Sequence, residues 1–312
     1  MKLLLNLFSL IILSANSCAS PVNDEDLKNA AKSNNKILYY EYSQDAYGYS
    51  VSRGALVLMD IENNKKIYIS KDAPTSLNPT FSPDGEKIAL TDFGRLEIWD
   101  LTNAKVKRIK ITDTNISSLN FLNNETLLYS RLNQVFKYSL FEDKSELLFE
   151  ANNGIIGISL SPSNIYLAVA IIKDNQQDLT PGIDIYFLSE NRLLKNITDA
   201  MFIGWVNNKE ILLRKYKVES ENLNYQIVNI LENKSFIIGE KINDSLSVNA
   251  TKYLNGKNFM EFGLDKPHTT ARGIYYYPDN IGLYEYDFST RNIRLIFGVD
   301  ETQEICDYYI KQ

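Results

Sequence analysis

The chain has 312 residues and a net charge of −6, and its 20 Tyr and 14 Phe suit β-strands. The length allows one large all-β domain or two smaller domains. The acidic balance argues against a nucleic-acid partner, which needs clustered Lys and Arg, and one His with two Cys excludes a zinc site of several His or Cys ligands. We therefore expect no metal, and no motif in the sequence predicts a cofactor.

Residues 1–20 have the layout of a secretory signal peptide. Lys2 precedes an apolar run over 3–13, and small residues follow as far as Ser20. A membrane span is excluded by length, because spanning takes about 20 apolar residues. The sequence therefore predicts an exported protein.

Cys18 leaves two kinds of processing open. Residues 15–18, Ala-Asn-Ser-Cys, resemble a bacterial lipobox, in which a small residue precedes a Cys that is lipidated and becomes the mature N-terminus. Asn16 and the absence of Leu at position 15 depart from that pattern, and ordinary cleavage after Ala19 or Ser20 is the alternative. We expect a periplasmic protein, or a lipoprotein of the bacterial outer membrane that touches the membrane only through Cys18.

Residues 21–35 are polar and lack a strand pattern, so we expect a tether or a short frayed helix before the folded domain. Asp24, Glu25 and Asp26 lie in one short run. Oxygen-ligand metal sites need groups that converge from different places, and this run therefore indicates a solvated acidic cluster.

Residues 78–113 are the clearest copy of a repeated unit. A short alternating run leads into the turn 82–85, Ser-Pro-Asp-Gly, where Pro presets one backbone angle and Gly is permissive. The runs 86–92, 95–101 and 106–112 then read as further strands. Four strands in about forty residues are typical of one β-propeller blade.

The segment NPTFSPDGEKIAL, residues 78–90, resembles the repeat of TolB-type propellers, which also occurs in the propeller domains of prolyl-oligopeptidase-like enzymes. That family pairs the repeat with binding roles or with a separate hydrolase domain. This chain has no room for a second domain of that kind. The resemblance therefore implies a propeller that acts by binding.

The third strand of each unit is the easiest to recognise, because it runs apolar and then turns polar at Asp or Asn. Copies occur at 55–63, 95–103, 134–143, 183–191, 225–233 and 282–290. The sequence thus predicts an all-β fold, a six-bladed β-propeller of four-stranded blades over residues 36–312, and we expect a monomer. In the first turns of later units, Asn residues of the pairs Asn123-Asn124 and Asn207-Asn208, and Asn164, are expected to take the left-handed backbone that Gly85 takes in the clearest unit.

The two ends of the domain complement each other. The first unit starts at its second strand, 37–43, while the strand 303–311 is left over at the C-terminus. We expect this C-terminal strand to complete the first blade as its innermost strand, which closes the ring and covers the sheet edges. Cys306 lies in it and lacks a disulfide partner in the mature chain, so we expect it to be buried there.

Long connections between second and third strands are expected in blades four, five, six and one, at 173–182, 215–224, 265–273 and 44–54, and 275–281 is a candidate addition to the one in blade six. They lie on one face of neighbouring blades, where loops on a rigid scaffold commonly bind. The side chains expected on this face are Tyr47, Tyr49, Arg53, Tyr216, His268, Arg272, Tyr275, Tyr276 and Tyr277. Tyr and Arg are favoured in protein-binding hot spots. The alternative is that these loops are tolerated insertions, with some tyrosines packed between blades.

The sequence contains no complete catalytic motif among those considered. A Ser-His-Asp triad would need His268, and the elbow-like segments 48–52 and 157–161 lack the final Gly and lie in strand or hairpin contexts. The 39 Asp and Glu leave one competing interpretation open, a carbohydrate-active or hydrolytic propeller with a carboxylate pair in its central funnel. The favoured prediction is a non-catalytic exported module that presents a loop-rich face to a protein or envelope polymer.

Overall fold

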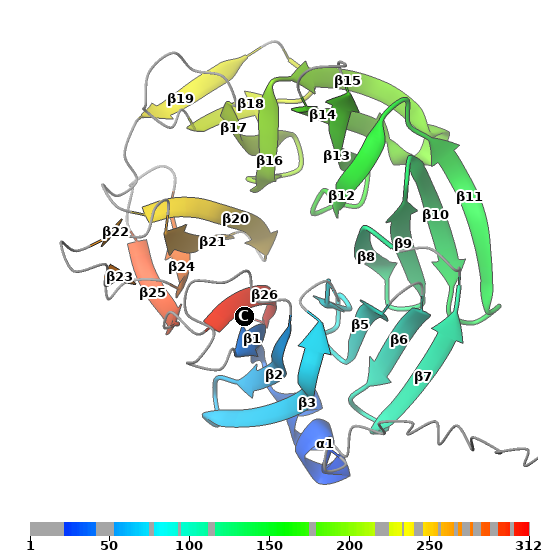
Figure 1. Cartoon of the computed structure of the whole chain (residues 1–312), viewed down its shortest axis with the longest axis vertical. Helices are drawn as coiled ribbons and strands as arrows, with labels where there is room; N and C mark the ends of the chain where they lie inside the picture. The colour runs from blue at the N-terminus through cyan, green and yellow to red at the C-terminus, as the bar shows by residue number, and fades with distance from the viewer. Residues whose placement is uncertain are drawn as a thin grey trace, which may run out of the picture.

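Antiparallel sheets arranged around a central axis make up the described part of the chain (Figure 1). The structure is a computed structural model. It describes residues 22–41, 53–74, 78–92, 95–111, 116–174, 179–215, 225–232, 234–239, 246–254, 257–264, 268–269, 275–276, 282–287, 293–299 and 303–311.

The first three blades are built as follows. Blade one comprises β26 (Gln303–Ile310), β1 (Asn35–Glu41), β2 (Arg53–Asp60) and β3 (Lys65–Pro74), in that order. Blade two comprises β4 (Thr80–Phe81), β5 (Lys87–Asp92), β6 (Arg95–Asp100) and β7 (Lys105–Lys110). Blade three comprises β8 (Ser118–Asn123), β9 (Thr126–Arg131), β10 (Gln134–Ser139) and β11 (Lys144–Glu150).

The other three blades follow the same plan. Blade four comprises β12 (Gly154–Leu160), β13 (Tyr166–Asp174), β14 (Leu179–Phe187) and β15 (Arg192–Thr198), with the 3-10 turn η2 (Leu188–Glu190). Blade five comprises β16 (Ala200–Trp205), β17 (Glu210–Lys215), β18 (Tyr225–Asn229) and β19 (Ser235–Gly239). Blade six comprises β20 (Leu246–Leu254), β21 (Lys257–Leu264), β24 (Gly282–Tyr286) and β25 (Ile293–Gly298), and β22 (His268–Thr269) pairs with β23 (Tyr275–Tyr276) between β21 and β24.

The predicted six-bladed propeller is confirmed. Every expected third strand is found, as β2, β6, β10, β14, β18 and β24. Blades five and six share one eight-stranded sheet only because a single parallel bridge, Gly204 to Thr251, joins their innermost strands β16 and β20.

Ring closure by the C-terminal strand is also confirmed. β26 pairs antiparallel with β1, from Asn35 opposite Ile310 to Glu41 opposite Gln303. The backbone groups of β1 are thus bonded on both sides, by β2 and by β26, and the first blade has no missing inner strand. Cys306 lies on β26 and is partly buried, packed against the apolar cluster between blades one and two.

The apolar core lies between successive blades rather than at one centre. One cluster joins Leu38 and Leu56 of blade one to Ile88 of blade two, and a separate cluster joins Tyr39 of blade one to Phe259 of blade six. Further clusters join blades two and three, three and four, and four and five. In the described part of the chain, blades one to four thus bury both faces on their neighbours, which is why a single blade cannot fold alone.

The turn chemistry agrees with the sequence at two positions and differs at two. Gly85 has a φ of +70° and Asn164 a φ of +58°, as expected. Asn124 and Asn208 do not adopt a positive φ. The preceding residues explain their turns, because Asn123 Oδ1 accepts a hydrogen bond from Glu125 N at 2.9 Å and Asn207 Oδ1 accepts one from Lys209 N at 2.8 Å. These are Asx turns, which need no left-handed residue.

The segment before the propeller is a docked helix rather than a tether. Helix α1 (Asp24–Lys32) is capped by Asn23, whose side chain accepts a hydrogen bond from Glu25 N at 3.0 Å. Leu27 and Ala30 are buried against the cluster of blades one and two. Of the two expectations, a tether or a short frayed helix, the helix is found, and its docking was not foreseen because only Leu27 and Ala30 form its apolar side. Among the described residues, no helix has the length and apolar character needed to cross a membrane.

Candidate binding face

Strand boundaries define the face on which the second-to-third connections lie, here called the binding face. The connections are residues 42–52 in blade one, 216–224 in blade five and 265–281 in blade six, against 93–94 in blade two and 132–133 in blade three. Long connections therefore gather on blades five, six and one, which follow one another around the ring (Figure 1).

Blade four departs from the prediction. Its connection is only residues 175–178, because β13 and β14 continue past the expected ends. Lys173 pairs with Thr180 and Asp174 with Leu179 in the antiparallel register. The polar run that suggested a loop is thus largely strand, and blade four adds little to the face.

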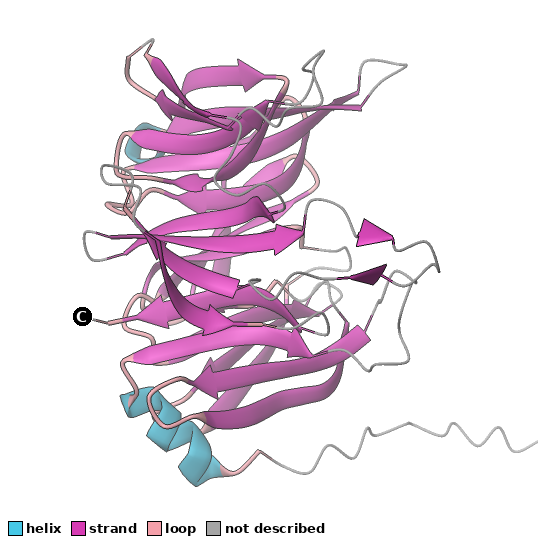
Figure 2. Cartoon of the chain, turned by 90° about the vertical axis from the view of Figure 1, so that its left-hand side faces the viewer, coloured by secondary structure: helices cyan, strands magenta, loops and turns pink. Residues whose placement is uncertain are grey.

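Part of the predicted set lies within the described residues. His268 is in β22 opposite Tyr276 in β23, and Tyr275 is opposite Thr269, so these predicted residues share one short hairpin. This hairpin lies on one side of the ring and α1 on the other (Figure 2). Arg53 begins β2 in the neighbouring blade one.

The remaining predicted residues cannot be placed. Tyr47, Tyr49, Tyr216, Arg272, Tyr277 and Cys18 lie outside the described residues. The side chains of Arg53, His268, Tyr275 and Tyr276 are likewise outside the described part, which gives these four residues a backbone position only. Their role in binding stays a prediction.

The base of the blade-one connection is held by a charged network at Glu41, the last residue of β1. Lys66 Nζ donates to its carboxylate at 2.8 Å and the Tyr68 hydroxyl at 3.0 Å. Partial burial opposes ionisation, but these hydrogen bonds outweigh it and lower the pKa of Glu41. The connection 42–52 therefore leaves the scaffold from a fixed, ionised anchor.

Exposed apolar side chains that sequence reasoning missed lie on the same face. Leu132, in the β9–β10 turn, is 67% exposed, and Ile156 near the start of β12 is 50% exposed. They are close in space, since Ile155 N donates to Leu132 O at 2.7 Å. Met201 takes a similar place at the start of β16 and is also exposed. An apolar Leu at a hairpin tip, where polar residues are usual, was the available signal.

The innermost strands bear on the competing enzyme interpretation. Their only carboxylate residues are Glu304 and Asp307, both on β26. The Asp307 carboxylate accepts hydrogen bonds from Thr80 Oγ1 at 3.1 Å, Phe81 N at 2.8 Å and Lys252 Nζ at 2.8 Å. This group therefore joins blades six, one and two, and its oxygens are engaged in structure. The side chain of Glu304 is not described.

Potential metal ligands in the part of the chain that the structure describes are its His, Cys, Asp and Glu side chains. Within it, no group of three or more His, Cys, Asp and Glu side chains could hold a metal ion. One acidic residue in the first turn of α1 has a structural role instead, because Asp26 forms an ion pair of 2.5 Å with Lys65 of β3.

Comparison with known proteins supports the architecture. No protein-family model matches the sequence, and no curated protein matches it. Among solved structures, TolB from Acinetobacter baumannii is similar with a TM-score of 0.50 and 14% identity, over 74% of this chain and 61% of TolB. The fold is shared. A chain of the nidogen/laminin complex is similar with a TM-score of 0.54 and 9% identity, over 88% of this chain and 97% of that one. This chain thus matches less than two thirds of the TolB length, and identities this low establish the propeller fold alone.

Proposed function

We propose that this chain is a non-catalytic binding module of the bacterial envelope, exported through residues 1–20. In this proposal the binding face contacts a protein or envelope polymer. The contact residues are Tyr47, Tyr49, Arg53, Tyr216, His268, Arg272, Tyr275, Tyr276 and Tyr277. The observation that carries the proposal is the gathering of long connections on blades five, six and one of a closed ring.

A closed ring gives such a face a rigid support. The clusters between blades and the bonds at Asp307 hold neighbouring blades in fixed relation, so loops on different blades keep their spacing. A preorganised surface binds with less loss of conformational entropy than a mobile one. Leu132, Ile156 and Met201 add exposed apolar area beside it.

The structural neighbours agree with this kind of role. One of them was solved in the nidogen/laminin complex, which is an assembly of proteins, and the other is a TolB. The engaged state of Asp307 weakens the competing idea of a carboxylate pair on the innermost strands, because that oxygen set already serves ring closure.

The proposal is tested by site-specific photocrosslinking in intact cells. A crosslinking amino acid is placed at Tyr277 on the binding face, and at Phe141 as the control, which is 90% exposed in a third-to-fourth turn on the opposite face. We expect one discrete adduct from position 277 and not from 141. Replacing Tyr275 by Ala should reduce its yield. Identical adducts from both positions would overturn the proposal.

A further inference from the structure

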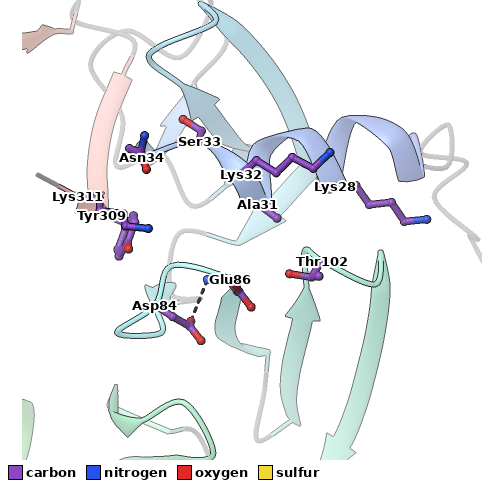
Figure 3. Close-up of a pocket in the computed structure, with 10 residues that line it drawn as sticks. All are labelled: Lys28, Ala31, Lys32, Ser33, Asn34, Asp84, Glu86, Thr102, Tyr309 and Lys311. Atoms are coloured by element: carbon purple, nitrogen blue, oxygen red, sulfur yellow. Dashed lines mark hydrogen bonds between the residues drawn. The ribbon is translucent and has the colours of Figure 1, made fainter.

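A cavity of about 340 Å³ lies between α1, the end of β26 and two turns of blade two, on the face opposite the binding face (Figure 3). Residues 82–86 and 101–104 form those turns, which join first to second and third to fourth strands. The volume equals the space of about eleven waters and is at the lower end of ligand pockets. It suits a ligand of roughly ten non-hydrogen atoms.

Charges of both signs surround this cavity. Lys28 and Lys32 come from α1, Asp84 and Glu86 come from the turn 82–86, and Lys311 lies at the end of β26 (Figure 3). Among the described residues, these three lysines form no ion pair, and the Glu86 carboxylate accepts no hydrogen bond. Asp84 Oδ1 already accepts hydrogen bonds from Ser82 Oγ at 2.5 Å and from Glu86 N at 3.0 Å. The three lysines and the Glu86 carboxylate are therefore the charged groups most available to a guest.

A buried ammonium group lies behind the wall. Lys36 is 0% exposed, and its Nζ donates to Ala31 O at 3.1 Å and lies 5.0 Å from the centre of the Tyr309 ring. Ala31 and Tyr309 both line the cavity. The Lys36 charge, little screened by water, therefore adds to the attraction for an anionic group placed against that wall.

We propose that this cavity binds a small zwitterion, a free amino acid or dipeptide with an unblocked ammonium and carboxylate. The carboxylate would lie toward Lys32 and Lys311, and the ammonium toward Glu86 and Asp84. The two carboxylates would repel a ligand that is only an anion, and the three lysines would repel a ligand that is only a cation. A ligand with both charges can pair with both kinds of side chain. Thr102 and Tyr309, which also line the cavity, carry hydroxyl groups that can hydrogen-bond to such a ligand.

The test compares Ala-Ala with its N-acetyl and C-amide derivatives by titration calorimetry on the whole chain. We expect Ala-Ala to bind with a dissociation constant on the order of 1 mM, and each blocked form about fivefold more weakly. Glu86→Gln should abolish the preference over the acetylated form. The double variant Lys32→Gln/Lys311→Gln should abolish the preference over the amide.

The matched control is Lys144→Gln/Glu146→Gln, an exposed charge pair on β11 of blade three. It should keep both preferences. The double lysine variant and the control should melt like the parent because the changed groups are on the surface, whereas Glu86→Gln removes a carboxylate that attracts the buried Lys36 ammonium and should melt slightly lower while staying folded. Equal binding of free and acetylated peptide would reduce the cavity to an anion site and overturn the proposal, as would the absence of saturable binding. Tyr275→Ala should leave dipeptide binding unchanged, which separates this site from the binding face.

Discussion

Lys252 Nζ on β20 lies 2.8 Å from Asp307 Oδ1 on β26, so an ion pair joins the innermost strands of the last and first blades. Asp307 is 12% exposed and also accepts the Phe81 backbone N–H. Replacing it by Ala should lower the free energy of unfolding by about 3 kcal/mol, because it removes the ion pair with Lys252 and leaves the Phe81 N–H and Thr80 hydroxyl of blade two without this acceptor. Asp307→Asn keeps an acceptor and should cost about half as much. Urea unfolding measures both.

Glu125→Gln is the control for that change. Glu125 pairs with Lys87 at 2.9 Å but is 62% exposed, and exposed pairs contribute less than about 1 kcal/mol. If Asp307→Ala lowers the free energy of unfolding no more than this control does, the Asp307 carboxylate does not stabilise the closed ring.

Gly85 should be intolerant of any side chain. Its φ is +70°, and an added Cβ would lie 2.6 Å from the Tyr309 ring. Gly85→Ala should therefore destabilise the fold by about 2 to 4 kcal/mol, through the left-handed backbone and through overpacking. Gly154→Ala is the matched control, since nothing lies within 4 Å of its Cβ position. Thermal unfolding distinguishes the two, and equal melting temperatures would contradict the packing described.

The ion pair of Lys252 with Asp307 and the contact of Gly85 with Tyr309 show which features could be predicted from the sequence and which could not. The Ser-Pro-Asp-Gly turn and the left-over strand 303–311 were readable, since turn residues and strand alternation are local signals. That Tyr309 of that strand packs on Gly85 of the turn was not, because no local pattern specifies which side chains meet across blades. The docking of α1 and the engaged carboxylate of Asp307 were missed for the same reason.

The candidate sites divide in the same way. The long connections in blades five, six and one were predicted from the spacing of the strands. The long connection predicted in blade four was wrong, because a polar run can continue a strand when its partner strand is in register. The cavity beside α1 could not be predicted at all. Its lining comes from α1, two turns of blade two and the C-terminus, segments far apart in the sequence.

Stability should depend on pH through Lys36. Burial lowers its pKa from 10.5 to about 8, against the opposing attraction of Asp60, Glu86 and Asp84, while Lys311 lowers it further. Between these values the unfolded chain binds more protons, so the folded state gains stability as pH rises. The parent should gain roughly 2 kcal/mol relative to Lys36→Met between pH 7 and pH 9.5. Denaturant titrations at both pH values measure the difference, and a constant difference would contradict the burial of a charged Lys36.

Helix α1 should contribute to the stability of the propeller. Leu27 is 3% exposed within the cluster of blades one and two, and Leu27→Ala should cost about 2 to 3 kcal/mol. Leu132→Ala, at a site 67% exposed, serves as the control and should change stability by less than about 0.5 kcal/mol. Calorimetry measures the melting temperature of both variants. Equal melting temperatures would mean that α1 does not stabilise the propeller.

The predicted signal peptide, residues 1–20, should be removed from the mature protein. Mass spectrometry of the protein from a bacterial host should give a mature chain that starts at Cys18 and carries a lipid, or one that starts after Ala19 or Ser20. A chain that retains Met1 in the cell envelope would contradict export through residues 1–20.

Closure of the ring by β26 is the claim on which the proposed sites depend, because it fixes the blades that carry them. Its most direct test removes residues 303–312 and returns them as a separate peptide. The truncated chain should lose cooperative unfolding, and the peptide, unlike one of scrambled sequence, should restore it by pairing with β1. A truncated chain that unfolds cooperatively at the parental temperature without peptide would contradict the closed ring.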